Sequence, residues 1–237
     1  TFAPMIDIAR DPRWGRVAEG NGEDPFLGAQ MAAAAVRGFQ GDELSAPEKI
    51  VACAKHYVGY GSAEGGRDYE NGEISEPTLR DIYLPPFESA VKAGVGTLMS
   101  AFLDLNGIPA TANRRLLTDV LRGEWGFDGF VVSDWDSVAE LIKHGVAEDR
   151  GQAAALALHA GVDMDMVSNA YIETLAASLQ SGKVPAEEID EAVRRIRCIK
   201  QRAGLFESPF TDIARASRDI LTEKSRALAR DFARQSM

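Results

Sequence analysis

Short β-prone segments alternate with amphipathic helical segments along this chain. Five segments have the length and apolar composition of strands, and a helical pattern follows each of them. They are Phe2–Ile8, Ile50–Ala54, Gly96–Ala101, Phe130–Ser133 and Val162–Met166. Because a strand, a helix and a second strand normally form a parallel crossover unit, the alternation predicts an α/β fold with a parallel sheet. Five strands fit either an open sheet or most of an eight-stranded barrel.

Capping residues and prolines mark the predicted helices. Asp24 and Pro25 supply an N-cap and a first-turn proline, and Gly41 ends the same helix. The other predicted helices are Pro77–Ala93, broken at Pro85-Pro86, and Asn113–Arg122, Asp136–His144, Arg150–Ala160, Ala170–Ser181, Pro185–Ala203 and Ser217–Met237. No Gly-x-Gly-x-x-Gly run joins a strand to a helix, which argues against a dinucleotide-binding fold.

The acidic balance of the chain narrows the classes of partner. Asp and Glu number 36 against 26 Lys and Arg, for a net charge of -10 at pH 7. Such a surface argues against nucleic acid or an anionic membrane as partner, and no apolar run is long enough to cross a bilayer. Cys53 and Cys198 lie in apolar runs and are predicted to be buried thiols. Three scattered histidines without zinc-ligand spacing predict no metal site, and no cofactor is expected.

The two ends predict a piece of a longer protein. The chain begins directly on a strand with neither an initiator methionine nor a signal peptide. It ends inside a helical pattern without a stop signal. We expect residues 1–205 to form one partial domain. Residues 206–237, which open on the turn-rich run Glu207-Ser208-Pro209, are expected to form a linker and a helix leading to a second domain.

The run from Gly129 to Trp135 carries the strongest chemical signal. Its apolar residues read as a short buried strand, and Ser133, Asp134 and Trp135 follow. In a parallel α/β barrel, the carboxyl ends of the strands lie on the face where chemistry occurs. A carboxylate there suits attack on the electron-poor carbon of a sugar, and an indole suits stacking on a pyranose ring. The alternative is that Asp134 caps the next helix, as aspartates after strands often do.

Two long loops follow strands and should rise from the same face. Ala9–Glu23 carries Arg16, and Tyr57–Glu76 carries Arg67; loops of this length are often functional. Each guanidinium could present a planar fork to vicinal hydroxyls. Each could instead brace its own loop through an acidic neighbour: Glu19, Glu23 or Asp24 for Arg16, and Asp68 for Arg67.

Lys55 and His56 directly follow the second predicted strand. Both side chains could donate hydrogen bonds to neighbouring hydroxyls of a sugar, although an isolated pair would more simply be a surface lysine and a structural histidine. Met99 and Phe102, at the end of the third strand, could form a pocket wall or belong to the core. We interpret the other two histidines, His144 and His159, as structural.

Taken together, six segments occur in the order and spacing of glycoside hydrolase family 3, which the chain resembles over nearly its whole length. They are Phe2–Asp7, Asp11–Arg16, Glu19–Pro25, Lys55–Tyr57, Gly65–Tyr69 and Val131–Trp135. The resemblance is to the bacterial two-domain β-glucosidases of the family. It implies a TIM-like (β/α)8 barrel, incomplete at its N-terminal end, and a linker to a missing α/β sandwich domain.

The resemblance also implies a retaining exo-β-glycosidase, in the first place a β-glucosidase that releases glucose from the non-reducing end of β-glucosides or cello-oligosaccharides. Asp134 would be the nucleophile. The substrate would be a β-linked oligosaccharide or an aryl glucoside, and the protein would be periplasmic or secreted. The acid/base glutamate would come from the missing domain, so neither Glu64 nor Glu70 is assigned that role. An upstream sugar-binding aspartate would also be missing.

The family pattern places four polar residues around the sugar hydroxyls and three apolar ones as walls. The polar set is Arg16, Lys55, His56 and Arg67, and the walls are Met99, Phe102 and Trp135. The nearby positive charges would favour the ionised form of the Asp134 carboxyl. Leu103 departs from the asparagine that many relatives have there, which bears on acceptor specificity.

Several alternatives remain open on the sequence. The N-acetylglucosaminidase branch of the family is disfavoured, because no third histidine follows the Lys55-His56 pair in its loop. β-Xylosidase and glycoside phosphorylase activities depend on segments outside this chain. A non-catalytic carbohydrate-binding protein on the same fold is a further alternative, against which the presence of Asp134, Lys55, His56 and Arg16 argues.

Overall fold

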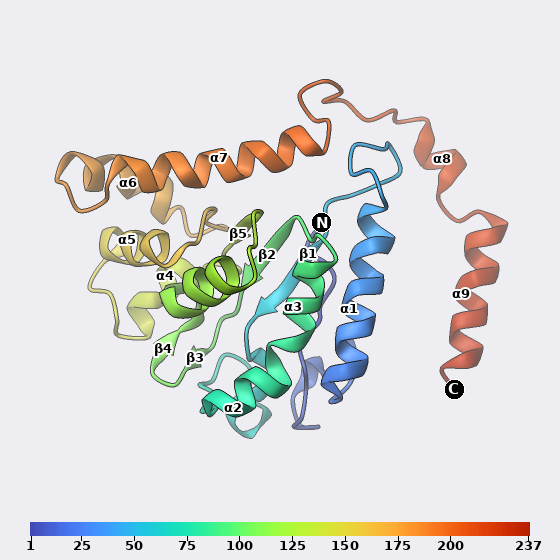
Figure 1. Ribbon diagram of the computed structural model, residues 1–237, viewed down its shortest axis with the longest axis horizontal. Coiled ribbons are helices and arrows are strands. Elements are labelled where there is room, and N and C mark those ends of the chain that lie inside the picture. The colour runs from blue at the N-terminus through green and yellow to red at the C-terminus, as the bar shows by residue number, and fades with distance from the viewer.

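A computed structural model describes all 237 residues (Figure 1). Its central sheet has three parallel strands in the order β1-β2-β5. These are β1 (Cys53–Tyr57), β2 (Thr97–Ser100) and β5 (Phe130–Val132). A small antiparallel hairpin, β3 (Asp104–Leu105) and β4 (Ile108–Pro109), follows β2. The predicted parallel α/β architecture is confirmed.

The first and last predicted strands border this sheet as extended segments. Met5 forms a parallel bridge with Lys55, and Met164 forms one with Val132. Each segment makes only an isolated bridge, so neither is a full strand. In space, the order of the five segments follows their order along the chain, as in consecutive staves of a barrel. The sheet is therefore an arc of a TIM-like barrel and does not close into a ring.

Helices follow the strands, and most of them cover the outer face of the arc, whereas the last two lie away from it in the C-terminal segment. The helices are α1 (Pro25–Gln40), α2 (Glu76–Thr78), α3 (Pro85–Lys92), α4 (Ser137–Lys143), α5 (Arg150–Ala160), α6 (Ala170–Gln180), α7 (Ala186–Arg202), α8 (Arg215–Asp219) and α9 (Glu223–Gln235). Helices α1 and α3 pack side by side, as do α5 and α6 (Figure 1). The main core lies between these helices and the sheet, where Leu98 and Val131 meet Phe87 and Leu121.

Helix α1 shows how the sequence sets these positions. The Asp24 carboxylate accepts the backbone N–H of Leu27 at 2.8 Å, which confirms the predicted cap. Gly41, at φ 60°, ends the helix. A Cβ atom on Gly28 would lie 2.8 Å from Ile8 Cδ1. The glycine therefore lets the helix approach the edge segment of the sheet closely.

Two predicted helices contain wide turns. In the segment predicted as Pro77–Ala93, a π-helical stretch, Leu79–Tyr83, joins α2 to α3. The chain stays right-handed helical at Leu84, so Pro85 changes the type of helix and does not break it. The segment predicted as Asn113–Arg122 is likewise π-helical, over Arg115–Glu124.

Strand β1 lies further along the chain than the predicted strand Ile50–Ala54. The backbone of Lys55 is paired with the N-terminal segment, donating to Pro4 O at 3.1 Å and accepting from the Ile6 N–H at 2.8 Å. By contrast, the N–H groups of Ile50 and Ala52 donate to residues at the end of α1. Lys55 and His56 therefore lie within a strand and not after it, which corrects the prediction.

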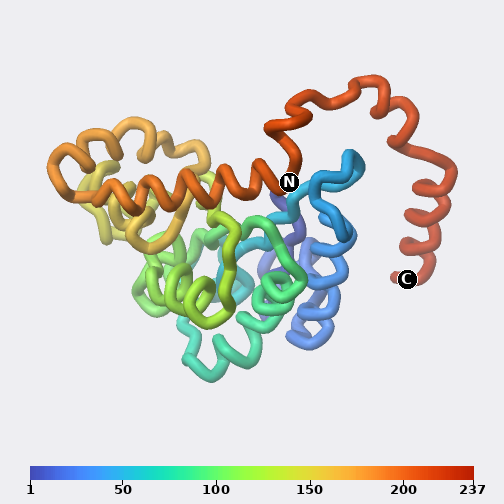
Figure 2. Tube along the Cα trace, turned by 45° about the horizontal axis from the view of Figure 1, so that its top comes forward, coloured from blue at the N-terminus to red at the C-terminus, as the bar shows by residue number.

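The C-terminal segment leaves the body of the protein after α7 (Figures 1 and 2). The single helix predicted over Ser217–Met237 is instead split into α8 and α9, with Leu221 between them in a left-handed conformation at φ 57°. Cys198, on α7, is partly exposed, which corrects its predicted burial, whereas Cys53 is buried as predicted.

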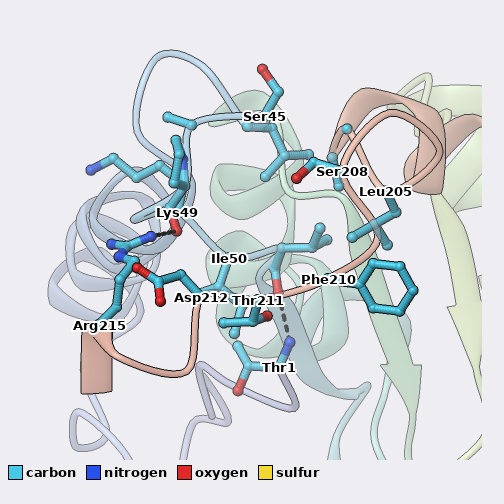
Figure 3. A pocket seen from close by; sticks show the side chains of 16 residues that line it. Thr1, Ser45, Lys49, Ile50, Leu205, Ser208, Phe210, Thr211, Asp212 and Arg215 are labelled. Atoms are coloured by element: carbon cyan, nitrogen blue, oxygen red, sulfur yellow. Dashed lines mark hydrogen bonds between the residues drawn. The ribbon is translucent and has the colours of Figure 1, made fainter. Parts of the chain in front are cut away.

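A cavity of about 560 Å³ lies where the C-terminal segment crosses the loop after α1 (Figure 3). Arg215 donates a hydrogen bond to Pro47 O at 2.9 Å, and the Thr1 amino group donates to Val51 O at 2.9 Å. None of the predicted site residues lines this cavity. It is separate from the carboxyl ends of the strands.

Candidate active site

Asp134 lies two residues after β5, at the carboxyl end of the strand, and only 8% of the residue is exposed. Its Oδ1 accepts the backbone N–H of Trp135 at 2.7 Å. Its Oδ2 is buried without a hydrogen-bond partner and lies 3.4 Å from His56 Nε2. Asp136, and not Asp134, is at the N-cap position of α4. The interpretation of Asp134 as a helix cap is therefore wrong.

His56 bridges two buried carboxylates. Its Nδ1 lies 2.8 Å from Asp7 Oδ2, and its backbone N–H donates to the same oxygen at 3.0 Å. Both side chains are almost completely buried. Asp7, His56 and Asp134 thus form a row that joins the N-terminal edge segment, β1 and the loop after β5.

Burial dominates the electrostatics of Asp134. It raises the pKa of the Asp134 carboxyl above its ordinary value, while the charges of His56, Lys55 and Arg16 and the bond from Trp135 N–H act in the opposite direction. The expected influence of Lys55 and Arg16 is present. It does not outweigh desolvation, because the side chain is deeply buried.

The backbone around Asp134 is anchored to the neighbouring loop. Ser133 Oγ donates to Asp134 O at 3.0 Å and accepts the N–H of Met166 at 2.8 Å. The N–H of Asp136 donates to Met166 O at 3.0 Å. Asp136 has φ 60° and Val167 has φ 72°. Left-handed conformations are costly for a β-branched residue and occur mainly where the surrounding structure enforces them.

Arg16 is held by an ion pair within its own loop. Its Nε donates to Glu19 Oε1 at 2.7 Å and its Nη2 to Glu19 Oε2 at 2.9 Å. The paired carboxylate raises the pKa of Arg16, and the guanidinium lowers the pKa of Glu19. The guanidinium also lies 5.4 Å from the centre of the Tyr60 ring. The loop-bracing interpretation with Glu19 is confirmed.

Arg67 lies apart from this cluster. Its side chain is 66% exposed and makes a long ion pair of 3.9 Å with Glu70. The partner predicted for it, Asp68, instead accepts the indole N–H of Trp14 at 2.9 Å. That prediction was wrong because a fully buried indole requires an acceptor for its N–H.

Tyr60 is the centre of an aromatic cluster beside His56. Its ring centre lies 5.0 Å from that of His56, 5.3 Å from Trp14 and 5.8 Å from Phe102. Tyr69 adds an edge contact to Phe102 at 4.8 Å. Tyr60 and Trp14 are fully buried. Phe102 therefore belongs to the wall of aromatic rings on one side of the candidate site.

The other apolar candidates occupy different depths. Met99 is buried with Cys53 and Val132 on the inner face of the sheet, where burial raises the pKa of the Cys53 thiol to about 11. Trp135 lies at the rim and is 63% exposed. Leu103 is fully buried in the hydrophobic cluster that contains Phe102.

Three residues of the site, Asp7, Tyr60 and Trp14, were not predicted as site residues from the sequence. Asp7 is the penultimate residue of the first predicted strand, Phe2–Ile8, and so lies near the same carboxyl edge as Asp134, which offered a signal for it. Tyr60 and Trp14 lie in the two long loops, and their burial depends on contacts that loop composition does not encode. His159 is structural as predicted: its Nδ1 pairs with Glu188 at 2.5 Å.

No group of three or more His, Cys, Asp or Glu side chains in the structure could hold a metal ion. No helix has the length and apolar character that crossing a membrane would require. The polar groups near the carboxyl ends of the strands include the carboxylates of Asp7 and Asp134 and the imidazole of His56, groups that can hydrogen-bond to a hydroxyl-rich molecule.

Comparison with known proteins assigns the chain to a family. Residues 1–199 match the family described as glycosyl hydrolase family 3 N terminal domain. A periplasmic beta-glucosidase from Salmonella typhimurium is 41% identical, covering 100% of this chain and 32% of the relative. A beta-xylosidase from Formosa agariphila is 40% identical, covering 100% of this chain and 34% of the relative.

Solved structures give the same assignment. The beta-glucosidase from Listeria innocua in complex with glucose has a TM-score of 0.95 and 46% identity, covering 98% of this chain and 32% of that chain. The present chain thus spans about a third of the length of these relatives. Because the family match covers most of its residues and the relatives align along its whole length, the chain belongs to glycosyl hydrolase family 3 and carries the N-terminal domain of that family.

Proposed function

We propose that the protein containing this chain is a retaining exo-β-glycosidase, specifically a β-glucosidase, with Asp134 as the nucleophile. The observation that carries the proposal is Asp134 Oδ2, a buried oxygen without a hydrogen-bond partner at the carboxyl end of a barrel strand. Leaving a buried carboxylate oxygen unpaired costs free energy. Such a cost is accepted where the lone pair is needed for a reaction.

In the proposed reaction, Asp134 Oδ2 bonds to the anomeric carbon while the bond from that carbon to the leaving oxygen breaks. A general acid protonates the leaving oxygen. Water then attacks the glycosyl-enzyme, giving its proton to the same residue and releasing the sugar with retained configuration. Retention requires the two carboxyl groups to lie about 5–5.5 Å apart. We propose that a glutamate from the rest of the protein, outside this chain, supplies the acid.

The proposed sugar subsite draws on the residues at the carboxyl ends of the strands. Lys55, His56 and Arg16 would donate to hydroxyls of the non-reducing-end sugar, with Trp135 stacking on the ring from the rim. Arg67 would join them by leaving its long contact with Glu70, which its exposure allows. Phe102 and Met99 would provide the apolar walls, Met99 from the deeper layer.

The relatives leave two sugars as candidates, because proteins named beta-glucosidase and beta-xylosidase match at nearly equal identity. Hydrolysis of matched aryl β-glucoside and aryl β-xyloside decides between them by the ratio of kcat/KM. A protein that binds sugar without releasing phenol from either would be a carbohydrate-binding protein. We further propose a periplasmic location, which the periplasmic beta-glucosidase relative supports.

The nucleophile can be identified by trapping. The full-length protein is incubated with a 2-fluoro aryl β-glucoside, which forms a slowly hydrolysed glycosyl-enzyme, and the labelled peptide is mapped by mass spectrometry. We expect the label on Asp134 and a fall in kcat of several orders of magnitude for Asp134→Asn. Asp136→Asn is the matched control, since asparagine tolerates the left-handed conformation at φ 60°. A label on any other residue contradicts the assignment.

A further inference from the structure

Asp7 is the one residue of the row Asp7–His56–Asp134 that is neither the proposed nucleophile nor a proposed sugar ligand. Asp7 Oδ2 receives two hydrogen bonds from His56, one from the backbone N–H at 3.0 Å and one from Nδ1 at 2.8 Å. Both partners are at most 2% exposed. The backbone bond fixes the position of the carboxylate relative to β1. The ring bond then fixes the rotation of the imidazole, so that Nε2 is turned towards Asp134 Oδ2 at 3.4 Å.

The protons in this row are constrained by its acceptors. Because Asp7 Oδ2 is an acceptor, the imidazole carries its proton on Nδ1. Nε2 then lies 3.4 Å from Asp134 Oδ2 without a hydrogen bond between them, so the oxygen stays available to the anomeric carbon.

We propose that Asp7 is a positioning residue of the active site, which holds the His56 ring in a fixed orientation beside the nucleophile Asp134. The inference rests on the function proposed above. Asp7 does not touch the sugar or the reacting atoms. Its influence passes through the one imidazole that contacts both carboxylates.

Charge is what separates this role from simple packing. The charge of Arg16 also acts on Asp134, but the carboxylate that holds Arg16 is that of Glu19, which is exposed. In an Asp7→Asn variant, the amide oxygen at the Oδ2 position can still accept both bonds from His56. The variant therefore keeps the shape but replaces two charge-assisted hydrogen bonds, which hold the ring more firmly, with neutral ones.

The test compares the wild-type full-length protein with Asp7→Asn, using an aryl β-glucoside and the 2-fluoro reagent. We expect kcat and the inactivation rate constant to fall about 10- to 100-fold, the scale of a mispositioned reacting group. The inhibition constant for glucose should change by less than about threefold, since a loss confined to kcat reports an interaction made in the transition state. Wild-type kcat in a folded Asp7→Asn variant would overturn the proposal.

A matched control is available on another strand. Asp163 is also buried and also accepts a backbone N–H from the sheet, that of Val131 at 2.8 Å. It contacts Arg122 and Arg195 and neither His56 nor Asp134. Asp163→Asn should lower stability while leaving kcat per folded molecule unchanged. An equal loss of kcat in both variants would mean that any buried aspartate of the sheet supports activity, which contradicts a specific role for Asp7.

A spectroscopic measurement does not depend on the folding of any Asp7 variant. In wild-type protein with ¹⁵N-labelled histidine, we expect Nδ1 of His56 to carry a proton that is hydrogen-bonded to Asp7, with the assignment made by loss of the signals in His56→Gln. A His56 ring without a proton on Nδ1 would overturn the proposal. If instead the wild-type protein shows no hydrolysis, or the trapped sugar is on another residue, the proposed function itself fails.

Discussion

Two buried aspartates on neighbouring segments of the sheet differ in how their carboxylate oxygens are hydrogen-bonded. Asp163 begins the segment that pairs with β5, and its two oxygens are fully used: Oδ2 accepts from Val131 N–H and Arg122, and Oδ1 accepts from Arg195. Asp134 lies past the carboxyl end of β5 and has one oxygen without a hydrogen-bond partner. Burial raises the pKa of both carboxyl groups.

The contrast separates structural from chemical use of the same side chain. A raised pKa alone does not distinguish the two aspartates, because desolvation acts on both. What distinguishes them is pairing. Asp163 is neutralised by two guanidinium groups and joins α7 and the π-helical segment Arg115–Glu124 to the sheet. Asp134 keeps one oxygen without a hydrogen-bond partner, and its only ion-pair contact is the 3.4 Å approach of His56 Nε2. In a barrel, one end of the strands serves stability and the other serves chemistry.

The largest effect we expect is on stability at Asp163. Asp163→Asn leaves Arg122 and Arg195 without their common anion, and breaking a buried ion pair of this kind costs about 3–5 kcal/mol. Asp134→Asn should leave the free energy of unfolding unchanged or raise it, because it replaces an unpaired buried carboxylate with a neutral group. Urea unfolding of the two variants checks both. Greater destabilisation by Asp134→Asn would contradict the distinction between the two aspartates.

A smaller effect is expected from a second comparison, between an exposed tryptophan and a partly buried one. Trp135 is mostly exposed at the rim, whereas Trp125 packs edge-on against Tyr57, with ring centres 6.0 Å apart. Trp135→Ala should weaken inhibition by glucose by about 1–3 kcal/mol, the range for a ring stacked on an aromatic side chain, and leave Tm unchanged. Trp125→Ala should lower Tm without affecting inhibition. Unchanged inhibition by glucose in Trp135→Ala would exclude it from the sugar subsite.

Periodicity and strand order predicted the parallel sheet and the position of Asp134, because the carboxyl ends of parallel strands lie along one edge. The same rule, applied to the first segment, would have pointed to Asp7. The extent of β1 was not predictable from composition. Lys55 and His56 read as the residues after a strand, yet their backbone groups are satisfied by the N-terminal segment, and the strand continues through them.

The loops were harder to predict, since their side-chain partners are chosen by burial. Arg16 and Glu19 are three residues apart, so local spacing placed Glu19 among the three predicted partners of Arg16. Asp68 pairs with Trp14, 54 positions away, because a buried indole N–H needs an acceptor. This long-range hydrogen bond forms in place of an ion pair between Asp68 and the adjacent Arg67, and nothing in the loop sequence indicates it.

The finest test of the comparison is the pH dependence of stability. The pKa of the Asp134 carboxyl is raised in the folded state above its ordinary value of 3.8. At pH values between the ordinary pKa of the unfolded chain and the raised pKa of the folded protein, the folded protein binds the proton more tightly. The free energy of unfolding therefore falls as the pH rises through that window. The contribution of Asp163 has the same sign and is common to wild type and Asp134→Asn. The difference between their unfolding free energies therefore isolates Asp134.

We expect the advantage of Asp134→Asn over wild type to grow as the pH rises through that window and then to level off. Because catalysis needs the ionised nucleophile, the acid limb of kcat/KM should lie at a higher pH than the ordinary aspartate value. Urea unfolding at a series of pH values and a pH–rate profile measure the two independently. A flat difference in stability together with an acid limb near 3.8 would mean that Asp134 is solvated like a surface carboxylate, and the contrast with Asp163 would then lose its basis.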